Sequence, residues 1–256
     1  MIKEETRFIS STVFEGMTSI RALIDNLKNN VIGARQIEKI LYDAEKEKSK
    51  SKELGYLKKM AEIYGFSVEK SEKSTIDSYT TGASHGGIIA LCKERTYNNI
   101  SFETIKSNGF YVMLEGIEDP YNFGYALRSI YASGADGIIL NKRNWLSAAG
   151  VVCRSSAGAS ERLNIYIATD DFIELFKSRK YKIVCADIKN SISVYDADLK
   201  KPLLLIVGGE KRGISSSVLE KADEIIRIDY GRDFAAALSA ASASTILAFE
   251  VYKQNK

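Results

Sequence analysis

The sequence contains too little cysteine and histidine for several common kinds of site. Three cysteines, Cys92, Cys153 and Cys185, and one histidine, His85, occur among its 256 residues. The cysteines lie far apart without a CxxC pair, which argues against a disulfide framework or a zinc site and favours a reducing compartment. A single histidine also argues against histidine-rich metal chemistry. We therefore expect no metal site.

Long apolar runs are absent as well. No stretch approaches the roughly 18 apolar residues of a membrane-spanning helix, and residues 1–11 carry acids without the apolar core of a signal peptide. Hydrophobic residues make up 45% of the chain and charged residues 27%, which is typical of a folded globular protein. These features predict a cytoplasmic protein that has no membrane partner.

The sequence also lacks an excess of one charge sign. Lysine and arginine total 36 against 33 aspartate and glutamate, a formal net charge of +3. The run EKEKSKSKE at 45–53 alternates in sign, which favours a solvated helix end or loop over an RNA contact. A nucleic-acid partner would therefore be met by a local patch and not by bulk charge.

The first part of the chain is predicted to form helices followed by short strands. Ile20, Leu23, Ile24 and Leu27 repeat at helical spacing, and residues 37–41 suggest a second helix. A third helix is expected over 54–64, ending near Gly65, and strands over 66–70 and 86–93. Residues 94–109 have weak periodicity and are typical of a linker.

From Phe110 onward, apolar strands alternate with helical stretches. This alternation predicts a mostly parallel sheet covered by helices, and such sheets bind ligands beyond the carboxyl ends of their strands. A long helix from Phe234 to about Lys253 is expected to close the chain. The strand candidates are FYVMLEG, DGIIL, LNIYIA, YKIVCA, PLLLIVGG and EIIRID.

Four loops that follow apolar runs collect glycines and polar residues, at 118–137, 155–159, 203–215 and 228–252. Taken singly, three of them have ordinary explanations. Residues 118–137 fit a capped helix with a surface arginine, residues 155–159 fit a tight turn, and residues 228–252 fit a small-residue core helix. The loop at 203–215 has the GxxxxG spacing of a phosphate loop but lacks its lysine, and no GxGxxG follows any strand. A nucleotide triphosphatase and an ordinary dehydrogenase are therefore disfavoured.

Together and in this order, the loops resemble the signature motifs of the SpoU/TrmH family, S-adenosylmethionine-dependent RNA ribose 2′-O-methyltransferases of the SPOUT superfamily. EGMTSIRALI near the start and SHGGIIAL before the linker resemble the family's small substrate-binding domain. The likeness covers most of the chain, and the joint pattern is specific where each piece alone is not. The matching positions are Asn122, Gly124, Arg128 and Gly134 in the first motif, SSAGA after it, and VGGEKRG in the second.

The third motif departs from the family pattern. Asp229 stands where the family usually has a proline, and Ala237-Leu238-Ser239 replace Ser-Leu-Asn after about one extra residue. Leu238 can still form a wall of the cofactor pocket. Ser239 keeps one hydroxyl, which can partly substitute for the missing side chains.

The resemblance implies a fold and an assembly. Residues 108–256 would form an α/β SPOUT methyltransferase domain, a parallel sheet with a deep trefoil knot, which is a rare exception to the rule against threaded chains. Residues 1–107 would form a small α+β, L30e-like RNA substrate-binding domain with its linker. The active site would lie at a homodimer interface formed by the C-terminal domain.

The resemblance also implies S-adenosylmethionine as cofactor, rRNA or tRNA as partner, and roles for individual residues. Arg128 would orient phosphate or ribose and stabilise negative charge on the ribose oxygen, since its high pKa makes it a poor base; the family proposal that it acts as the base stays open. Asn122 would position Arg128 or the ribose, and Glu210 would fix Arg128 or the substrate loop. The implied catalytic residues are Asn122, Arg128, Glu210 and Ser239, and the implied cofactor-binding residues are Gly208, Gly209, Gly213, Ile228 and Leu238.

Two other functions remain open at this point. The chain could be a non-catalytic RNA- or ribosome-binding protein that keeps the SPOUT fold, because its third motif has changed. It could also be a SPOUT enzyme that methylates a base instead of a ribose. The retained Asn122, Arg128 and Glu210 favour an active ribose methyltransferase.

Overall fold

The computed structural model describes residues 12–29, 33–80, 85–141 and 148–256 and divides into two compact units. The first unit holds the described residues up to Thr96 together with those between 144 and 162. The second holds those from Tyr97 to 143 and from Leu163 to Lys256. This division differs from the predicted boundary at 107/108, because residues 97–107 join the second unit and a later segment joins the first.

Pairing and packing explain the difference. Within the expected linker, β5 (Asn98–Asn99) pairs in parallel with β8 (Ile165–Ile167) and so extends the second unit's sheet. Helices α5 (Ala149–Ser155) and α6 (Ala159–Arg162) pack against α1 (Gly16–Lys28) of the first unit. The RNA-binding role of residues 1–107 stays a prediction.

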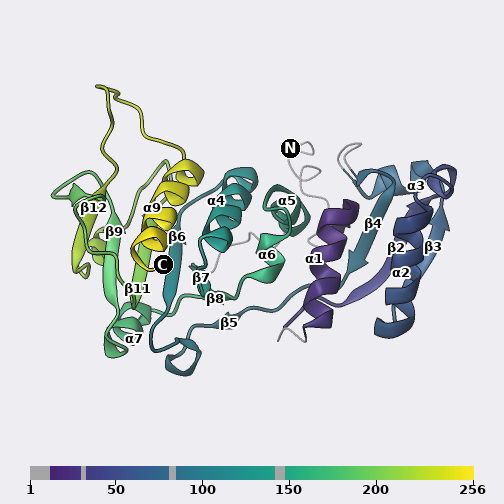
Figure 1. The fold of residues 1–256 in the computed structure, drawn as a ribbon, viewed down its shortest axis with the longest axis horizontal. Helices are drawn as coiled ribbons and strands as arrows, with labels where there is room; N and C mark the ends of the chain where they lie inside the picture. Colours follow the sequence, from purple (N-terminus) through teal and green to yellow (C-terminus); the bar gives the residue numbers. More distant parts are fainter. Residues whose placement is uncertain (1–11, 30–32, 81–84, 142–147) are drawn as a thin grey trace, which may run out of the picture. The chain divides into compact units, whose positions relative to one another are not determined.

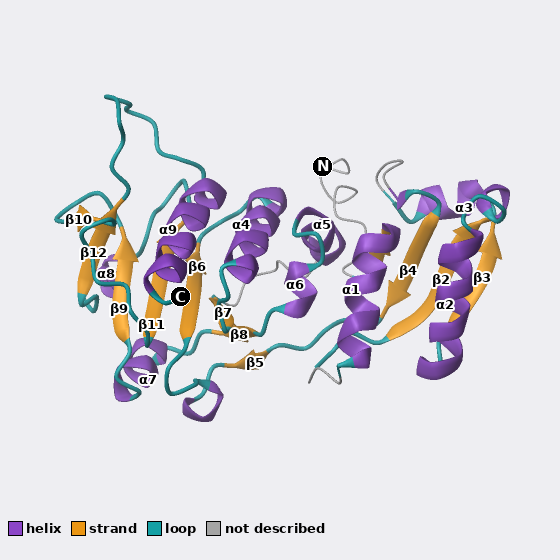
Figure 2. Ribbon diagram, viewed as in Figure 1, coloured by secondary structure: helices purple, strands orange, loops and turns teal. Residues whose placement is uncertain are grey.

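The first unit contains a four-stranded mixed sheet in the order β1-β4-β2-β3, in which only β2 and β3 pair in parallel. Strands β4, β2 and β3 can be followed in Figure 2. The predicted first and third helices and both strands are confirmed, and Gly65 ends α2 in the left-handed conformation. The elements, besides α5 and α6, are β1 (Val13–Glu15), α1 (Gly16–Lys28), β2 (Ile37–Asp43), η2 (Ala44–Lys46), α2 (Ser51–Tyr64), β3 (Ser67–Ser71), α3 (Lys73–Ser78) and β4 (Ile88–Cys92).

The helix predicted over 37–41 is wrong, because these residues form the central strand β2. Ile40 and Tyr42 face the larger core of this unit, while Leu41 packs in a second cluster with Ile76 on the other face of the sheet. A strand buried on both faces has consecutive apolar residues, and a short run of that kind matches helical spacing as well as it matches a strand.

A buried charge cluster holds α6 within the first unit. Glu161, 2% exposed, accepts from Arg35 Nε at 3.4 Å and lies 3.8 Å from Arg95 Nη1. Both arginines are buried, and each also donates to a backbone carbonyl oxygen, Arg35 to Lys93 and Arg95 to Ser160. Charges this deep are tolerated because they are paired and hydrogen-bonded to one another.

The second unit is built on an eight-stranded parallel sheet in the order β10-β12-β9-β11-β6-β7-β8-β5. All six strand candidates of this half are confirmed, as is the parallel sheet. Its remaining elements are η4 (Phe102–Thr104), β6 (Phe110–Glu115), α4 (Pro120–Ala132), β7 (Gly137–Leu140), α7 (Phe172–Ser178), β9 (Lys182–Ala186), β10 (Ile192–Ser193), β11 (Leu203–Gly208), α8 (Ser216–Leu219), β12 (Glu224–Arg227) and α9 (Ala240–Gln254).

Helices cover both faces of this sheet. Tyr111 of β6 and Leu204 of β11 pack with Phe176 of α7 in one core cluster. The neighbouring residues Val112 and Leu205 are equally buried and point to the opposite face, where α4 and α9 lie side by side (Figure 1). The strands are therefore apolar along their whole length, as expected for a sheet buried on both faces.

The start of α9 differs from the prediction. The helix begins at Ala240, whereas residues 234–239 belong to an irregular loop. Ser239 is the N-cap, and its hydroxyl oxygen accepts from the backbone N–H of Ser242 at 3.1 Å. A serine hydroxyl that accepts from this amide favours a helix start at the next residue. The alanine side chains before it cannot accept a hydrogen bond.

The three cysteines are buried free thiols. Burial raises the pKa of the Cys153 and Cys185 thiols to about 12 each, so both are protonated at neutral pH. Among the described residues, no helix is both long enough and apolar enough to cross a membrane.

We expect Glu161→Ala to lower the free energy of unfolding by about 3–5 kcal/mol, because it leaves two buried guanidinium groups without their shared carboxylate. Urea denaturation followed by circular dichroism measures the loss. Glu174→Ala is the control, since Glu174 pairs with Lys221 while 57% exposed and its pair is worth at most about 1 kcal/mol. Equal losses in the two variants would contradict the stabilising role of the buried cluster.

Ser239→Ala is expected to destabilise the second unit by about 1 kcal/mol, because the first turn of α9 loses its cap. Ser239→Asp keeps an acceptor and is expected to restore most of the stability. Ser215→Ala serves as a matched control, since Ser215 precedes α8 without a side-chain capping bond. Thermal unfolding compares the three, and a Ser239→Ala midpoint equal to that of Ser215→Ala would rule out a capping contribution.

Candidate active site

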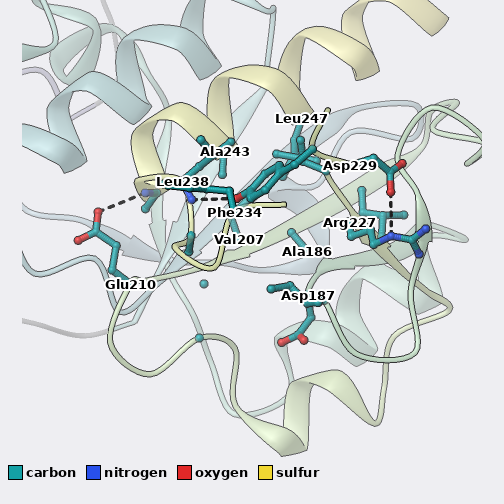
Figure 3. Close-up of a pocket in the computed structure, with 18 of the residues that line it drawn as sticks. Ala186, Asp187, Val207, Glu210, Arg227, Asp229, Phe234, Leu238, Ala243 and Leu247 are labelled. Carbon is teal, nitrogen blue, oxygen red and sulfur yellow. Dashed lines mark hydrogen bonds and ion pairs between the residues drawn. The ribbon is translucent and has the colours of Figure 1, made fainter. Parts of the chain in front are cut away.

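A cavity of about 530 Å³ opens at the carboxyl ends of three neighbouring strands, β9, β11 and β12 (Figure 3). This is the edge where parallel α/β sheets bind ligands, and the volume lies in the range of small-molecule sites. The lining residues are Ala186, Asp187, Ile188, Val207, Gly208, Gly209, Glu210, Gly213, Ile226, Arg227, Ile228, Asp229, Tyr230, Arg232, Asp233, Phe234, Ala237, Leu238, Ala240, Ala243 and Leu247.

All five predicted cofactor-binding residues, Gly208, Gly209, Gly213, Ile228 and Leu238, line this cavity. They come from two segments, the loop after β11 and the loop before α9. The structure therefore brings together the two sequence motifs from which they were predicted. Their contact with a cofactor stays a prediction.

The two adjacent glycines are required by close backbone packing. A Cβ on Gly208 would lie 2.5 Å from the carbonyl carbon of Gly213, and one on Gly209 would lie 2.1 Å from the carbonyl oxygen of Gly116. Gly209 also donates its N–H to Glu115 O at 2.6 Å. Any larger residue would push the loop after β11 away from the loop after β6, and with it the cavity wall.

Glu210 links three elements of the second unit. Its Oε1 accepts from Asn122 Nδ2 of α4 at 3.1 Å. It also accepts from the backbone N–H of Ala240, the first residue of α9, at 3.3 Å (Figure 3). Asn122 is held in turn by the Asp119 cap, whose carboxylate accepts from the Asn122 N–H at 2.8 Å. Asn122 and Glu210 thus form a connected pair at the edge of the cavity.

Ser239 lies next to this pair, and its hydroxyl is already used within the chain. It accepts from the Ser242 N–H and lies 3.1 Å from Ser242 Oγ. Ser239 is not among the residues that line the cavity. The structure thus gives this predicted catalytic residue a capping role at the start of α9.

Arg128 lies apart from the other predicted catalytic residues. It is exposed on α4, forms no ion pair with the described residues, and does not line the cavity. Tyr125 and Tyr121 are exposed about one and two helical turns before it, respectively, on the same side of the helix. Within one chain, Glu210 therefore connects Asn122 to the loops that line the cavity, and Arg128 lies on an open helix surface.

Several polar residues of the cavity were missed by sequence reasoning. Asp187 follows β9, and the strand order places it beside the loop after β11. At the position of the family's proline, Asp229 Oδ1 accepts from Arg227 Nε at 2.9 Å. A hydrogen bond from Ser193, with the Arg227 charge, holds the pKa of the Asp229 carboxyl below its usual value. The sequence signal that could have identified Asp187 as a site residue is its position as an acidic residue directly after an apolar strand.

The lining combines an apolar wall with several charges. Val207 and Leu247 are almost completely buried, while the carboxylates of Asp187 and Glu210 border the same space. Such a lining fits a ligand that carries an aromatic ring, hydroxyl groups and a positive charge. Among the described residues, no group of three or more His, Cys, Asp or Glu side chains is placed to hold a metal ion.

Known proteins are similar to this chain in sequence. A TrmH-family tRNA/rRNA methyltransferase of Staphylococcus haemolyticus is 30% identical over 195 residues, which cover 73% of this chain and 77% of that protein. The 23S rRNA (guanosine-2′-O-)-methyltransferase RlmB of Shewanella oneidensis is 26% identical over 206 residues, 77% of this chain and 82% of its own length.

Solved structures support the fold. An AdoMet-bound rRNA methyltransferase from Sinorhizobium meliloti superimposes with a TM-score of 0.76 at 23% identity, over 94% of this chain and 87% of the other. The SpoU methyltransferase AviRb from Streptomyces viridochromogenes, in complex with AdoMet, gives a TM-score of 0.76 at 20% identity, over 99% and 93% of the two chains.

The model of the SpoU rRNA methylase family matches residues 109–249, which include β6, the loop after β11, the cavity and most of α9. More than half of the chain is therefore matched, and the matched part contains every predicted site residue. The chain belongs to the SpoU rRNA methylase family.

Proposed function

We propose that this protein transfers a methyl group from S-adenosylmethionine to a ribose 2′-hydroxyl of rRNA or tRNA in the cytoplasm. The observation that carries the proposal is the cavity at the ends of β9, β11 and β12, which all five predicted cofactor residues line. Glu210, which accepts a hydrogen bond from Asn122, lines the same cavity. Similarity to a guanosine-2′-O-methyltransferase supports ribose as the acceptor.

The residues present fit S-adenosylmethionine, which supplies an electrophilic methyl group when bound. Leu238, Ile228 and Val207 offer an apolar surface to its adenine ring, and the carboxylate of Asp187 can accept hydrogen bonds from ribose hydroxyls. The lining contains four carboxylates against two guanidinium groups, and this excess of negative charge favours a cationic ligand over a neutral one of the same shape. The carboxylates are those of Asp187, Glu210, Asp229 and Asp233, and the guanidinium groups are those of Arg227 and Arg232.

The protein's task is to place the acceptor oxygen and to favour its negative charge. Methyl transfer is an in-line displacement, so the oxygen must be held about 3–3.5 Å from the methyl carbon. Arg128 can bind the neighbouring phosphate and stabilise negative charge on that oxygen, because a guanidinium group presents several N–H donors and a positive charge. Asn122, fixed by Glu210, would orient the ribose beside it.

We also propose that the active unit is a homodimer formed through α4 and α9. Tyr121, Tyr125, Phe249 and Tyr252 are between 42% and 50% exposed on these two adjacent helices. Aromatic side chains exposed together on neighbouring helices are typical of protein interfaces. In such a pair Arg128, exposed on α4, would complete the site at the partner's cavity.

The remaining implications of the resemblance belong to the same proposal. The first unit would present RNA to the site as an L30e-like domain, and the second would contain the trefoil knot of SPOUT enzymes. Support for the knot is the close approach of the loops after β6 and β11, beside which the chain passes into α9. Support for the RNA-binding domain is its compact mixed sheet, which precedes the methyltransferase unit in the chain.

The activity is tested with purified protein, tritiated S-adenosylmethionine and total RNA from a strain that lacks the gene. We expect label in one RNA fraction, and at least about a 100-fold slower reaction for Arg128→Ala, as expected when a charge-stabilising group is removed. Arg179→Ala is the control, since Arg179 is a half-buried arginine of the same unit that stacks on Phe102 and does not line the cavity. Nucleoside analysis of the product locates the methyl group on ribose or base.

Each negative result has a distinct meaning. Label on a base would establish a SPOUT base methyltransferase and contradict the proposed acceptor. Absence of label with total RNA, precursor RNA and ribosomal particles, despite clear cofactor binding, would favour the non-catalytic RNA-binding protein. The capping role of Ser239 is the observation that favours this second function, because its hydroxyl is engaged within α9.

Mixed dimers test whether Arg128 acts on the partner's cavity. A chain with Arg128→Ala is co-expressed with a differently tagged chain whose cavity is filled by Ala243→Trp, and the doubly tagged dimer is purified. If the site is shared, each parent is inactive and the mixed dimer recovers about half of wild-type activity, because one of its two sites is complete. An inactive mixed dimer would place Arg128 at its own chain's site, and a monomer in light scattering would overturn the dimer.

A further inference from the structure

The loop that joins β12 to α9 carries two exposed aromatic side chains, and both line the cavity. Tyr230 is 41% exposed and Phe234 is 60% exposed, and their ring centroids lie 6.2 Å apart with the rings tilted by 51°. The immediate neighbours of Phe234 are Asp233 and Ala235, which are charged or small. A phenylalanine this exposed gains little from the fold, and burial against a ligand would stabilise it.

Both ends of this loop are fixed. Tyr230 Oη accepts from the backbone N–H of Leu238 at 3.0 Å, a bond that closes a segment of nine residues around Phe234 (Figure 3). The Arg227–Asp229 ion pair holds the chain before Tyr230, and the Ser239 cap holds it after Leu238. Phe234 therefore lies in the middle of a tethered loop and not on a free end.

Another part of the cavity wall is apolar and well packed. Val207 ends the buried part of β11, and Leu247 lies in the packed part of α9; they are 2% and 1% exposed. Ala243 adds a small side chain one turn before Leu247. A flat heteroaromatic ring that enters the cavity would lie against this wall on one side and could be covered by the Phe234 ring on the other.

We propose that Phe234 stacks on the purine ring of the bound cofactor and that Tyr230 is a positioning residue that holds it there. This assignment rests on the proposed function, since it takes S-adenosylmethionine as the ligand of the cavity. The cofactor's purine is favoured over an RNA base because Phe234 lines the same cavity as Gly208, Gly209 and Leu238. Removing an aromatic side chain stacked on a base weakens binding by about 5- to 150-fold.

Isothermal titration with S-adenosylhomocysteine, the demethylated product, tests the stacking residue in the full-length protein. We expect Phe234→Ala to raise the Kd about tenfold or more and Phe234→Trp to keep it near the wild-type value. Tyr195→Ala is the matched control, since Tyr195 is an aromatic residue 57% exposed in the same unit that does not line the cavity. Unchanged thermal unfolding of Phe234→Ala would confirm that the loop residue does not support the fold.

Three results would contradict either the stacking or the proposed function. An unchanged Kd for Phe234→Ala would overturn the stacking, and a raised KM for RNA in the same variant would show that the ring faces the substrate. A loss as large in Tyr195→Ala would also overturn it, because the effect would not belong to the cavity. No binding to the wild-type chain would overturn the proposed function itself.

The positioning role of Tyr230 is tested by a double-mutant cycle. Tyr230→Phe keeps the ring and removes the hydroxyl that accepts from Leu238, so we expect a rise of the Kd of about threefold or more. In the Phe234→Ala background the same substitution should have no further effect, because the residue it positions is gone. An equal effect in both backgrounds would show that Tyr230 acts independently of Phe234 and would overturn its positioning role.

Discussion

The site depends on one close approach of backbone, where the loop after β11 lies against the loop after β6. Gly209 is in contact with the carbonyl of Gly116, at a distance that leaves no room for a Cβ, and its N–H is bonded to Glu115 O. This contact turns the loop so that Glu210 lies between Asn122 of α4 and the first amide of α9. The two glycines therefore determine where the Glu210 carboxylate lies, and so how it connects α4 to α9 on one face of the sheet.

The same backbone contact places Glu210 where it accepts from the first amide of α9. The helix start is therefore ordered, although the third motif departs from the family pattern. The first amide groups of a helix need acceptors, and here Glu210 and Ser239 supply them to Ala240 and Ser242. The acceptor at Ala240 comes from a loop far away in the sequence, so the helix start and the cavity wall form one structure. A substitution that disturbed Glu210 would alter both the helix start and the Asn122 side chain.

Much of the methyltransferase unit was predictable because its strands are short apolar runs separated by glycines and polar turns. The four loops lie at strand ends, so the edge that holds the cavity followed from the parallel arrangement. The N-terminal strand β2 was not predictable, since a run buried on both faces has no clear period. The assignment of α6 to the first unit was also hidden, because Glu161 looks like a surface acid until Arg35 and Arg95 surround it.

The sequence by itself determined the family, the parallel sheet and the residues that form the loops around the cavity. Each of these features depends on local patterns in contiguous stretches of the chain. Only the tertiary structure decided that Asn122 contacts Glu210, that Ser239 caps a helix, that Arg128 stays on an open surface and that Phe234 lines the cavity. These depend on strand order and on loops meeting across long sequence separations, which residue spacing alone does not specify.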